Sequence, residues 1–304
     1  MSAARRTGLR RAGCGLVLLA ALGVSLAAPA SELQLVGEAE VLLPGILSRA
    51  TDEQVATVHP TGSIIVFDCP DCDTGRDPDL WLVQRRGASW VGPGRAKPSS
   101  IAREASPAFS SDGAWLYYVS ERGGGFGGAD LFRAAYASHR DKFFTAENLG
   151  ASVNSPGEEG GATALAADTG VIFASRGRKG ARGWDLFVSR RVDGRLAPAQ
   201  PLASLNTAAD ETAPALLPDE RGLLFVRDAQ AWFAPRRGEG YGQAQRLSAA
   251  VNAPGSRVLG VQHAHDTPDQ LVFTRAGREG RGDVLRIRYR VVSGEEGDRA
   301  ADDR

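Results

Sequence analysis

The stretch EASPAFSSDGAWLYYVSERGGGFGGADLFRA, residues Glu104 to Ala134, alternates short apolar runs with residues typical of tight turns. Its Asp112-Gly113 pair lets the chain reverse, because glycine tolerates positive φ and aspartate caps its own backbone. The run that follows is nearly all apolar, which is typical of a strand buried on both faces. The stretch therefore predicts three antiparallel strands joined by two turns.

Three glycines of this stretch, Gly123, Gly125 and Gly128, match the G-x-G-x-x-G pattern of dinucleotide-binding loops. That fingerprint requires a helix directly after the loop. Strand-like apolar and aromatic residues follow Asp130 instead, and the equivalent loops elsewhere in the chain do not keep the pattern. We therefore interpret the glycines as a turn between two strands and expect no bound nucleotide.

The segment after the glycine loop recurs along the chain at intervals of about 45–55 residues, in the range of β-propeller blades. Its clear copies start at Asp79, Asp130, Asp185 and Asp283, and a degenerate copy starts at Ala231. A turn and an apolar strand precede each copy, and a fourth strand follows all but the last. Three of these fourth strands lead into an asparagine: Asn154, Asn206 and Asn252. Each repeat thus predicts a four-stranded blade.

The two ends of the repeat array complement each other. The last copy has no fourth strand after it, whereas Leu33–Leu43 has a fourth-strand pattern with no preceding strands. We expect this segment to add as the outer strand of the final blade and to close the ring, which protects the sheet edges. The sequence therefore predicts an all-β, five-bladed propeller over residues 31–293.

The first thirty residues have the features of an export signal, namely a basic start, an apolar run and an A-x-A site at Ala28–Ala30. We expect cleavage near Ala30 and a periplasmic or secreted mature chain without a transmembrane segment. Cys14 lies before the apolar run, which argues against a lipoprotein anchor. Sec and twin-arginine export both stay open. The hydrophilic residues 294–304 predict a disordered tail.

The strongest repeats resemble those of the TolB-type WD-like β-propeller family, whose motif reads S-P-x-[FW]-S-P-D-G-x-x-[IL]-x-[FY]-x-S-x-R. The matching residues are Ser106, Pro107, Phe109, Ser110, Asp112, Gly113, Leu116, Tyr118, Ser120 and Arg122, followed by Asp130 and Leu131. A second copy keeps Asp168, Gly170, Phe173, Ser175, Arg176, Asp185 and Leu186. The resemblance implies an exported binding or scaffold module. We expect the chain to lack the N-terminal α/β domain that TolB carries.

Acidic residues precede the innermost predicted strands and are expected near the mouth of the central channel, where propeller loops carry function. Trp184 follows a basic loop and is expected to be partly exposed. The candidate binding residues are Glu104, Glu158, Glu159, Asp210, Glu211 and Trp184. They predict a surface for an envelope protein or peptide.

His263 and His265 lie on one face of an extended segment, a spacing compatible with a metal ion. Asp266 or His59 would supply a third ligand, as in a metal-assisted polysaccharide lyase or hydrolase. We favour the simpler interpretation of a strand face between two blades. A glycan-binding propeller without turnover is a further alternative.

After signal cleavage only two cysteines stay, Cys69 and Cys72, in the sequence CPDC. In an exported protein such a pair indicates a local disulfide, with a quiet thiol pair and a redox C-x-x-C as alternatives. The aspartates that start the third strands, at 79, 130, 185 and 283, are interpreted as turn-closing residues. Their convergence on calcium is the alternative.

The charges of the chain balance, with 36 Lys and Arg against 36 Asp and Glu. No overall field attracts nucleic acid or an anionic membrane, so we expect neither as a partner. No nucleophile elbow of the G-x-S-x-G type is present. We therefore expect a non-enzymatic binding module with no catalytic residues and no cofactor.

Overall fold

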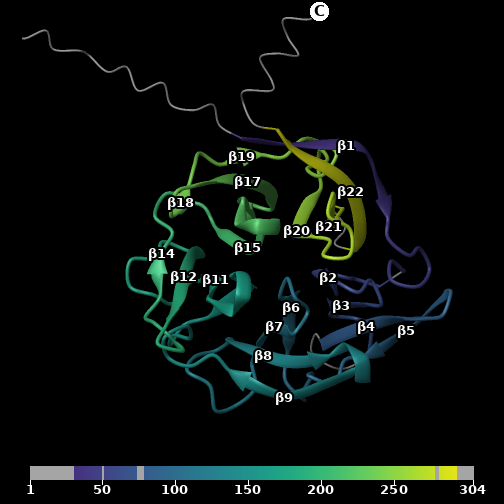
Figure 1. Ribbon diagram of the computed structural model, residues 1–304, viewed down its shortest axis with the longest axis horizontal. Coiled ribbons are helices and arrows are strands. Elements are labelled where there is room, and N and C mark those ends of the chain that lie inside the picture. The colour runs from purple at the N-terminus through teal and green to yellow at the C-terminus, as the bar shows by residue number, and fades with distance from the viewer. Residues whose placement is uncertain (1–30, 50, 74–78, 278–280, 293–304) are drawn as a thin grey trace, which may run out of the picture.

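The structure is a computed structural model that describes residues 31–49, 51–73, 79–277 and 281–292. Five antiparallel sheets form a ring around a central axis, as Figure 1 shows. The prediction of an all-β, five-bladed propeller is confirmed. The predicted signal peptide, its cleavage site and the tail at 294–304 lie outside the described residues.

The blades follow one another along the chain. Blade 1 contains β2 (Ala56–Val58), β3 (Ile64–Cys69), β4 (Asp79–Arg86) and β5 (Ser89–Arg95). Blade 2 contains β6 (Glu104–Phe109), β7 (Trp115–Ser120), β8 (Asp130–Ala137), the short η1 (Ser138–Arg140) and β9 (Lys142–Asn148). Blade 3 contains β10 (Glu159–Ala164), η2 (Ala166–Asp168), β11 (Gly170–Ser175), β12 (Asp185–Val192), β13 (Arg195–Leu196) and β14 (Gln200–Pro201).

Blade 4 contains β15 (Glu211–Leu216), η3 (Pro218–Glu220), β16 (Gly222–Arg227), β17 (Gln230–Arg237), β18 (Gly240–Tyr241) and β19 (Gln245–Arg246). Blade 5 contains β20 (Arg257–His263), β21 (Gln270–Ala276) and β22 (Gly282–Val292). The first strand of each blade lies nearest the axis, so β2, β6, β10, β15 and β20 contact one another around the channel.

Blade 5 is completed by β1 (Glu32–Val41), the first strand of the chain. It pairs antiparallel with β22, with Leu33 opposite Val291 and Val41 opposite Leu285. Figure 1 shows the purple β1 beside the yellow β22 at the outside of the ring. The predicted closure by Leu33–Leu43 is therefore confirmed, with slightly different strand ends.

The core lies between neighbouring blades. Ile64 and Val66 of blade 1 pack with Leu116 and Tyr118 of blade 2, and similar clusters fill the other junctions of the ring. The second strands β3 and β11 are buried along their whole length, as their apolar runs predict. Because each blade buries its faces against two neighbours, the blades depend on one another for stability.

A side chain joins each outer strand to the third strand of its blade. Asn154 accepts a hydrogen bond from the Leu131 N–H at 2.8 Å and donates one to the Leu131 carbonyl at 3.1 Å. Asn206 and Asn252 make the same pair of bonds in blades 3 and 4. The hydroxyls of Ser99 and Ser48 replace the amide in blades 1 and 5. All five blades thus share this pair of hydrogen bonds to the third strand. The recurring asparagines of the sequence indicated it for three of the blades.

Within the described residues, no helix has the length and apolar character needed to cross a membrane.

Candidate functional site

A cavity of about 320 Å³ opens at the end of the channel where the innermost strands begin. Residues from all five blades line it, including Val55, Ala105, Gly161, Thr212 and Leu259. We call this end the tryptophan mouth, because Trp184 belongs to its lining. It is the end at which the acidic residues were expected.

Three of the predicted mouth carboxylates are buried and form hydrogen bonds inside the blades. Glu104 is fully buried and accepts hydrogen bonds from the Ser100 N–H at 2.7 Å and from the Ser100 and Ser120 hydroxyls. Arg122 adds an ion pair at 3.1 Å. Each oxygen of Glu104 is therefore bound by the protein itself.

The same joint recurs in the next two blades. Glu159 accepts from the Ser155 N–H and hydroxyl and from the Ser175 hydroxyl, and burial raises its pKa. Glu211 accepts from the N–H and hydroxyl of Thr207 and pairs with Arg227 at 2.7 Å. Both side chains are almost completely buried. These carboxylates hold the start of an innermost strand to the preceding loop and to the second strand.

The other predicted mouth residues form one partly exposed group at the junction of blades 3 and 4. Glu158 pairs with Arg176 at 2.6 Å, and the Arg176 guanidinium lies 5.1 Å from the centre of the Trp184 ring. The backbone N–H of Trp184 donates to the Asp210 carboxylate at 2.9 Å. Glu158 and Trp184 line the cavity. A ligand in the channel mouth can therefore reach a carboxylate and an aromatic ring together.

Asp68 is a buried carboxylate in the lining that the sequence reasoning missed. It accepts a hydrogen bond from the Val55 N–H at 2.6 Å. Burial raises the pKa of Asp68 to about 6, although the backbone bonds from Val55 and Ser106 and the charge of Arg103 favour its ionised form. The available signal was its position, because Asp68 interrupts an otherwise apolar second strand.

β-Bulges shape this mouth. The pairing of β6 with β7 shifts between Ala105 and Ala108, and that of β15 with β16 shifts between Thr212 and Ala215. Within these shifts Ser106 has φ 55° and Ala213 has φ 48°. A bulge removes a residue from the sheet ladder, so its peptide groups become available to other partners. β10 and β20 carry shifts at corresponding places.

The glycine loop at 121–129 joins β7 to β8, so a strand follows it, as interpreted from the repeat. Asp130 closes the loop by accepting from the Phe126 N–H at 2.7 Å and the Gly127 N–H at 3.2 Å. The Gly128 N–H donates to the Gly157 carbonyl of the next blade at 3.0 Å. A side chain at Gly127 would collide with the backbone of 155–157. The glycines therefore allow two blades to approach backbone to backbone.

A second cavity, of about 250 Å³, lies where the innermost strands end. We call it the histidine mouth, because His263 and His265 line it with their ring centres 5.4 Å apart. Burial lowers the pKa of both histidines, that of His265 to about 4. His59 lies in the neighbouring blade, and burial lowers its pKa as well. Burial therefore favours the uncharged form of all three imidazoles.

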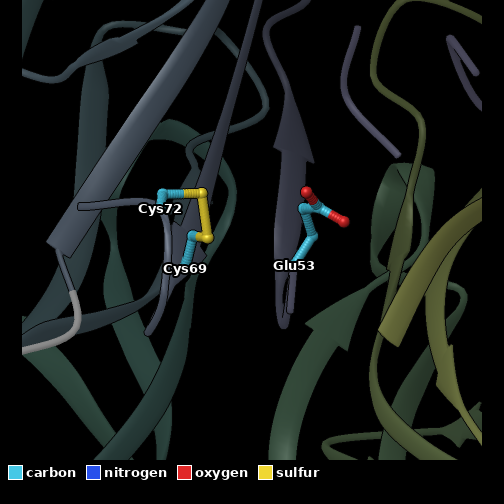
Figure 2. A group of neighbouring side chains, drawn as sticks. All are labelled: Glu53, Cys69 and Cys72. Atoms are coloured by element: carbon cyan, nitrogen blue, oxygen red, sulfur yellow. A yellow bond between two sulfur atoms is a disulfide. The ribbon is translucent and has the colours of Figure 1, made fainter. Parts of the chain in front are cut away.

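The histidines do not meet a third ligand within the described part of the chain. There, the only group of three His, Cys, Asp or Glu ligand atoms within 4.8 Å of one another is Glu53, Cys69 and Cys72. Cys69 and Cys72 are joined by a disulfide with S–S 2.00 Å, as Figure 2 shows. Their sulfur atoms are thus not free thiolates, and the metal-assisted hypothesis gains no further support from the geometry.

The aspartates of the third-strand column lie in separate blades. Asp130 and Asp185 accept hydrogen bonds from loop N–H groups, as turn-closing residues do. Asp79 forms a two-bonded ion pair with Arg95, and Asp283 is exposed. The structure does not bring these carboxylates together.

No protein-family model matches the sequence, and the search of curated proteins finds no match. Among solved structures, glutaminyl cyclase of Myxococcus xanthus is similar, with a TM-score of 0.51 and 12% identity over 88% of this chain and 100% of that one. A TolB protein from Agrobacterium tumefaciens gives a TM-score of 0.49 and 13% identity over 83% and 80% of the two chains. A gluconolactonase of Xanthomonas campestris gives 0.47 and 11% over 86% and 99%. At these identities the likenesses concern the fold alone, which the strand pairing shows to be a five-bladed β-propeller.

Proposed function

We propose that this protein is a non-enzymatic, exported propeller that binds a peptide segment of an envelope protein at the tryptophan mouth. The observation that carries the proposal is a cavity on the ring axis that is lined from all five blades. Its lining includes Glu158 and Trp184, both of which Arg176 contacts. The export signal and the TolB-type repeats, both inferred from the sequence, support the cellular setting.

The chemistry of the mouth suits a peptide with a basic or amide-rich side. Glu158 offers a carboxylate that a ligand cation can share with Arg176, and the Trp184 ring offers an apolar face. Gly160 and Gly161 place side-chain-free backbone in the lining, beside the shifted register of β10. An extended peptide can therefore approach closely and exchange backbone hydrogen bonds there.

Site-specific photo-crosslinking tests the proposal in cells that export the full chain. A photo-reactive amino acid at position 184 is expected to give one discrete adduct with an envelope protein. The matched control places the same group at Phe144, which is 46% exposed on the outer strand β9. Because Glu158 contributes to binding, Glu158→Gln should reduce the adduct at position 184 several-fold. Equal adducts at both positions, or an adduct insensitive to Glu158→Gln, would contradict the proposal.

A further inference from the structure

The disulfide of blade 1 lies in a short loop at the end of β3. Cys69 is the last residue of β3 and is 2% exposed, whereas Cys72 is partly exposed. Their sequence separation is only 3. A cross-link stabilises a fold mainly by restricting the unfolded chain, and it does so least when the closed loop is short. Stabilisation of the fold is therefore a weak explanation for this pair.

Two charged side chains lie beside the two sulfur atoms. A carboxylate oxygen of Glu53 lies within 4.8 Å of both of them, and Figure 2 shows Glu53 beside the disulfide. Nη2 of Arg49 lies 3.5 Å from Sγ of Cys72. A disulfide is uncharged and needs neither group. A thiolate, in contrast, is stabilised by a nearby cation, and a thiol can donate its hydrogen to a carboxylate.

Glu53 is fully buried and only partly paired. Its Oε1 accepts a hydrogen bond from the Thr51 hydroxyl, whereas Oε2 has no hydrogen-bond partner among the described residues. Burial raises the pKa of Glu53, although Thr51 and the charge of Arg49 favour its ionised form. Neither sulfur of a disulfide carries a hydrogen. Reduction would give Cys69 a hydrogen inside the protein, close to this carboxyl group, so no access from solvent is needed.

Backbone contacts hold Glu53 next to the cysteine loop. The Asp52 N–H donates to the Asp71 carboxylate at 2.7 Å, and the Gln54 N–H donates to the Asp68 carbonyl at 2.9 Å. These two bonds fix the residues on either side of Glu53 to the residues on either side of Cys69 and Pro70. The position of the carboxyl group therefore does not depend on the S–S bond.

We propose that Cys69 and Cys72 form a redox site that exchanges two electrons with external thiols. A thiolate attacks the partly exposed sulfur of Cys72 and forms a mixed disulfide, while the Cys69 sulfur leaves and takes up a proton. A second thiolate attacks the external sulfur of that mixed disulfide, and Cys72 leaves as a thiolate beside Arg49. The protein gains two electrons, and the two external thiols become one disulfide. Of their two protons, one goes to Cys69 and one to solvent. This exchange does not rest on peptide binding at the tryptophan mouth.

Glutathione is the probe for the exchange in the folded protein. The exported chain carries Cys14→Ser, so that Cys69 and Cys72 are its two cysteines. It is equilibrated with mixtures of reduced and oxidised glutathione, and free thiols are counted by maleimide labelling while circular dichroism follows the fold. We expect half-reduction of the folded protein within these mixtures, because labile disulfides exchange with glutathione and structural ones resist it. A pair that stays oxidised until the protein unfolds would overturn the proposal.

Single-cysteine variants test which sulfur is attacked. In Cys69→Ser the sulfur of Cys72 stays partly exposed, so oxidised glutathione should leave one stable adduct on it, which mass spectrometry detects. Cys72→Ser is the matched control, because it keeps the buried Cys69, and it should form the adduct at least about 10-fold more slowly. Equal rates in the two variants, or a faster reaction at Cys69, would overturn the assignment of Cys72 as the attacked sulfur.

Two further variants test the neighbouring charges. Glu53→Gln has no acceptor in place of Oε2, so half-reduction should require a ratio of reduced to oxidised glutathione about 5-fold higher. Arg49→Gln should raise the midpoint pH for alkylation of Cys72 in the reduced protein by about one unit. Arg86→Gln, which breaks an exposed ion pair in the same blade, is the control and should change neither quantity. Glu53→Gln and Arg49→Gln variants that both match this control would overturn the roles assigned to the two charges.

Discussion

Glu104, Glu159 and Glu211 show how one residue type acquires a structural role through repetition. Each begins an innermost strand and accepts from the N–H and hydroxyl of the residue four positions earlier. In the sequence they are indistinguishable in kind from Glu158 and Asp210, which stay partly exposed at the mouth. A shift of one position along the chain decides whether a carboxylate is bound inside its blade or faces solvent.

Removing one joint carboxylate should destabilise the propeller strongly. In Glu104→Ala, the Ser100 N–H, the Ser120 hydroxyl and Arg122 lose their common acceptor. The free energy of unfolding is expected to fall by about 3 kcal/mol, because the partly buried arginine is left unpaired. Urea denaturation measures this. Glu121→Ala removes an exposed ion pair and should cost less than about 1 kcal/mol; equal losses would contradict the assigned role.

Asp68 predicts a specific dependence of stability on pH. Its pKa is about 6 in the folded protein and 3.8 ordinarily, so between these values the folded state binds a proton that the unfolded state lacks. This contribution to stability is full below about pH 4, is lost as the pH rises to about 6, and amounts to roughly 3 kcal/mol. Asp68→Asn should lack it. The buried histidines have the opposite effect, because their lowered pKa values make the folded protein less stable as the pH falls below 6.5. This effect is the same in the wild type and in Asp68→Asn. The difference between wild type and Asp68→Asn, measured by urea denaturation from pH 4 to 7, isolates Asp68; a constant difference would refute this.

At the scale of elements, the glycine loop and the strand joints explain how blades hold together. The loop between β7 and β8 touches the start of blade 3 through the Gly128 N–H and the Gly157 carbonyl. The asparagines after the outer strands extend the ladder of the third strand without adding a strand. Both devices depend on backbone geometry, which is why small or amide-bearing residues recur at those positions.

A side chain in the glycine loop should weaken the junction of blades 2 and 3. In Gly127→Ala the new methyl group meets the backbone of 155–157, so the loop must move. We expect a loss of about 1–3 kcal/mol in the free energy of unfolding, the usual cost of overpacking. Gly123→Ala is the matched control, because open space surrounds that position. Thermal and urea denaturation compare the two variants, and similar stability would show that the close approach is unimportant.

At the scale of the whole molecule, ring closure is the decisive feature. β1 and β22 come from opposite ends of the chain, and their pairing joins the outer strand to blade 5. Leu33 is buried in the cluster between blades 4 and 5. The closure therefore couples the N-terminal strand to the cooperative unfolding of the ring.

A charge placed at the closure should lower the stability of the entire ring. Leu33→Glu puts a carboxylate in an apolar junction, and the free energy of unfolding is expected to fall by about 2–4 kcal/mol. Val36→Glu, at a side chain 40% exposed on the same strand, is the control and should change stability by less than about 1 kcal/mol. Circular dichroism during urea denaturation reports both. Identical urea midpoints for the two variants would mean that the packing of β1 does not contribute to the stability of the ring.

The sequence by itself determined the blade number, the strand order and the closure by β1, because turns such as Asp112-Gly113 and the apolar second strands are local signals that recur with the repeat. It also predicted Glu158 and Trp184 as mouth residues. Only the tertiary structure decided that Glu104, Glu159 and Glu211 are enclosed by their own blades. It also placed Asp68 at the tryptophan mouth and His263 at the opposite one. The physical reason is that exposure and pairing at the axis depend on contacts between strands of different blades, which are set by ring geometry and leave no local pattern in the chain.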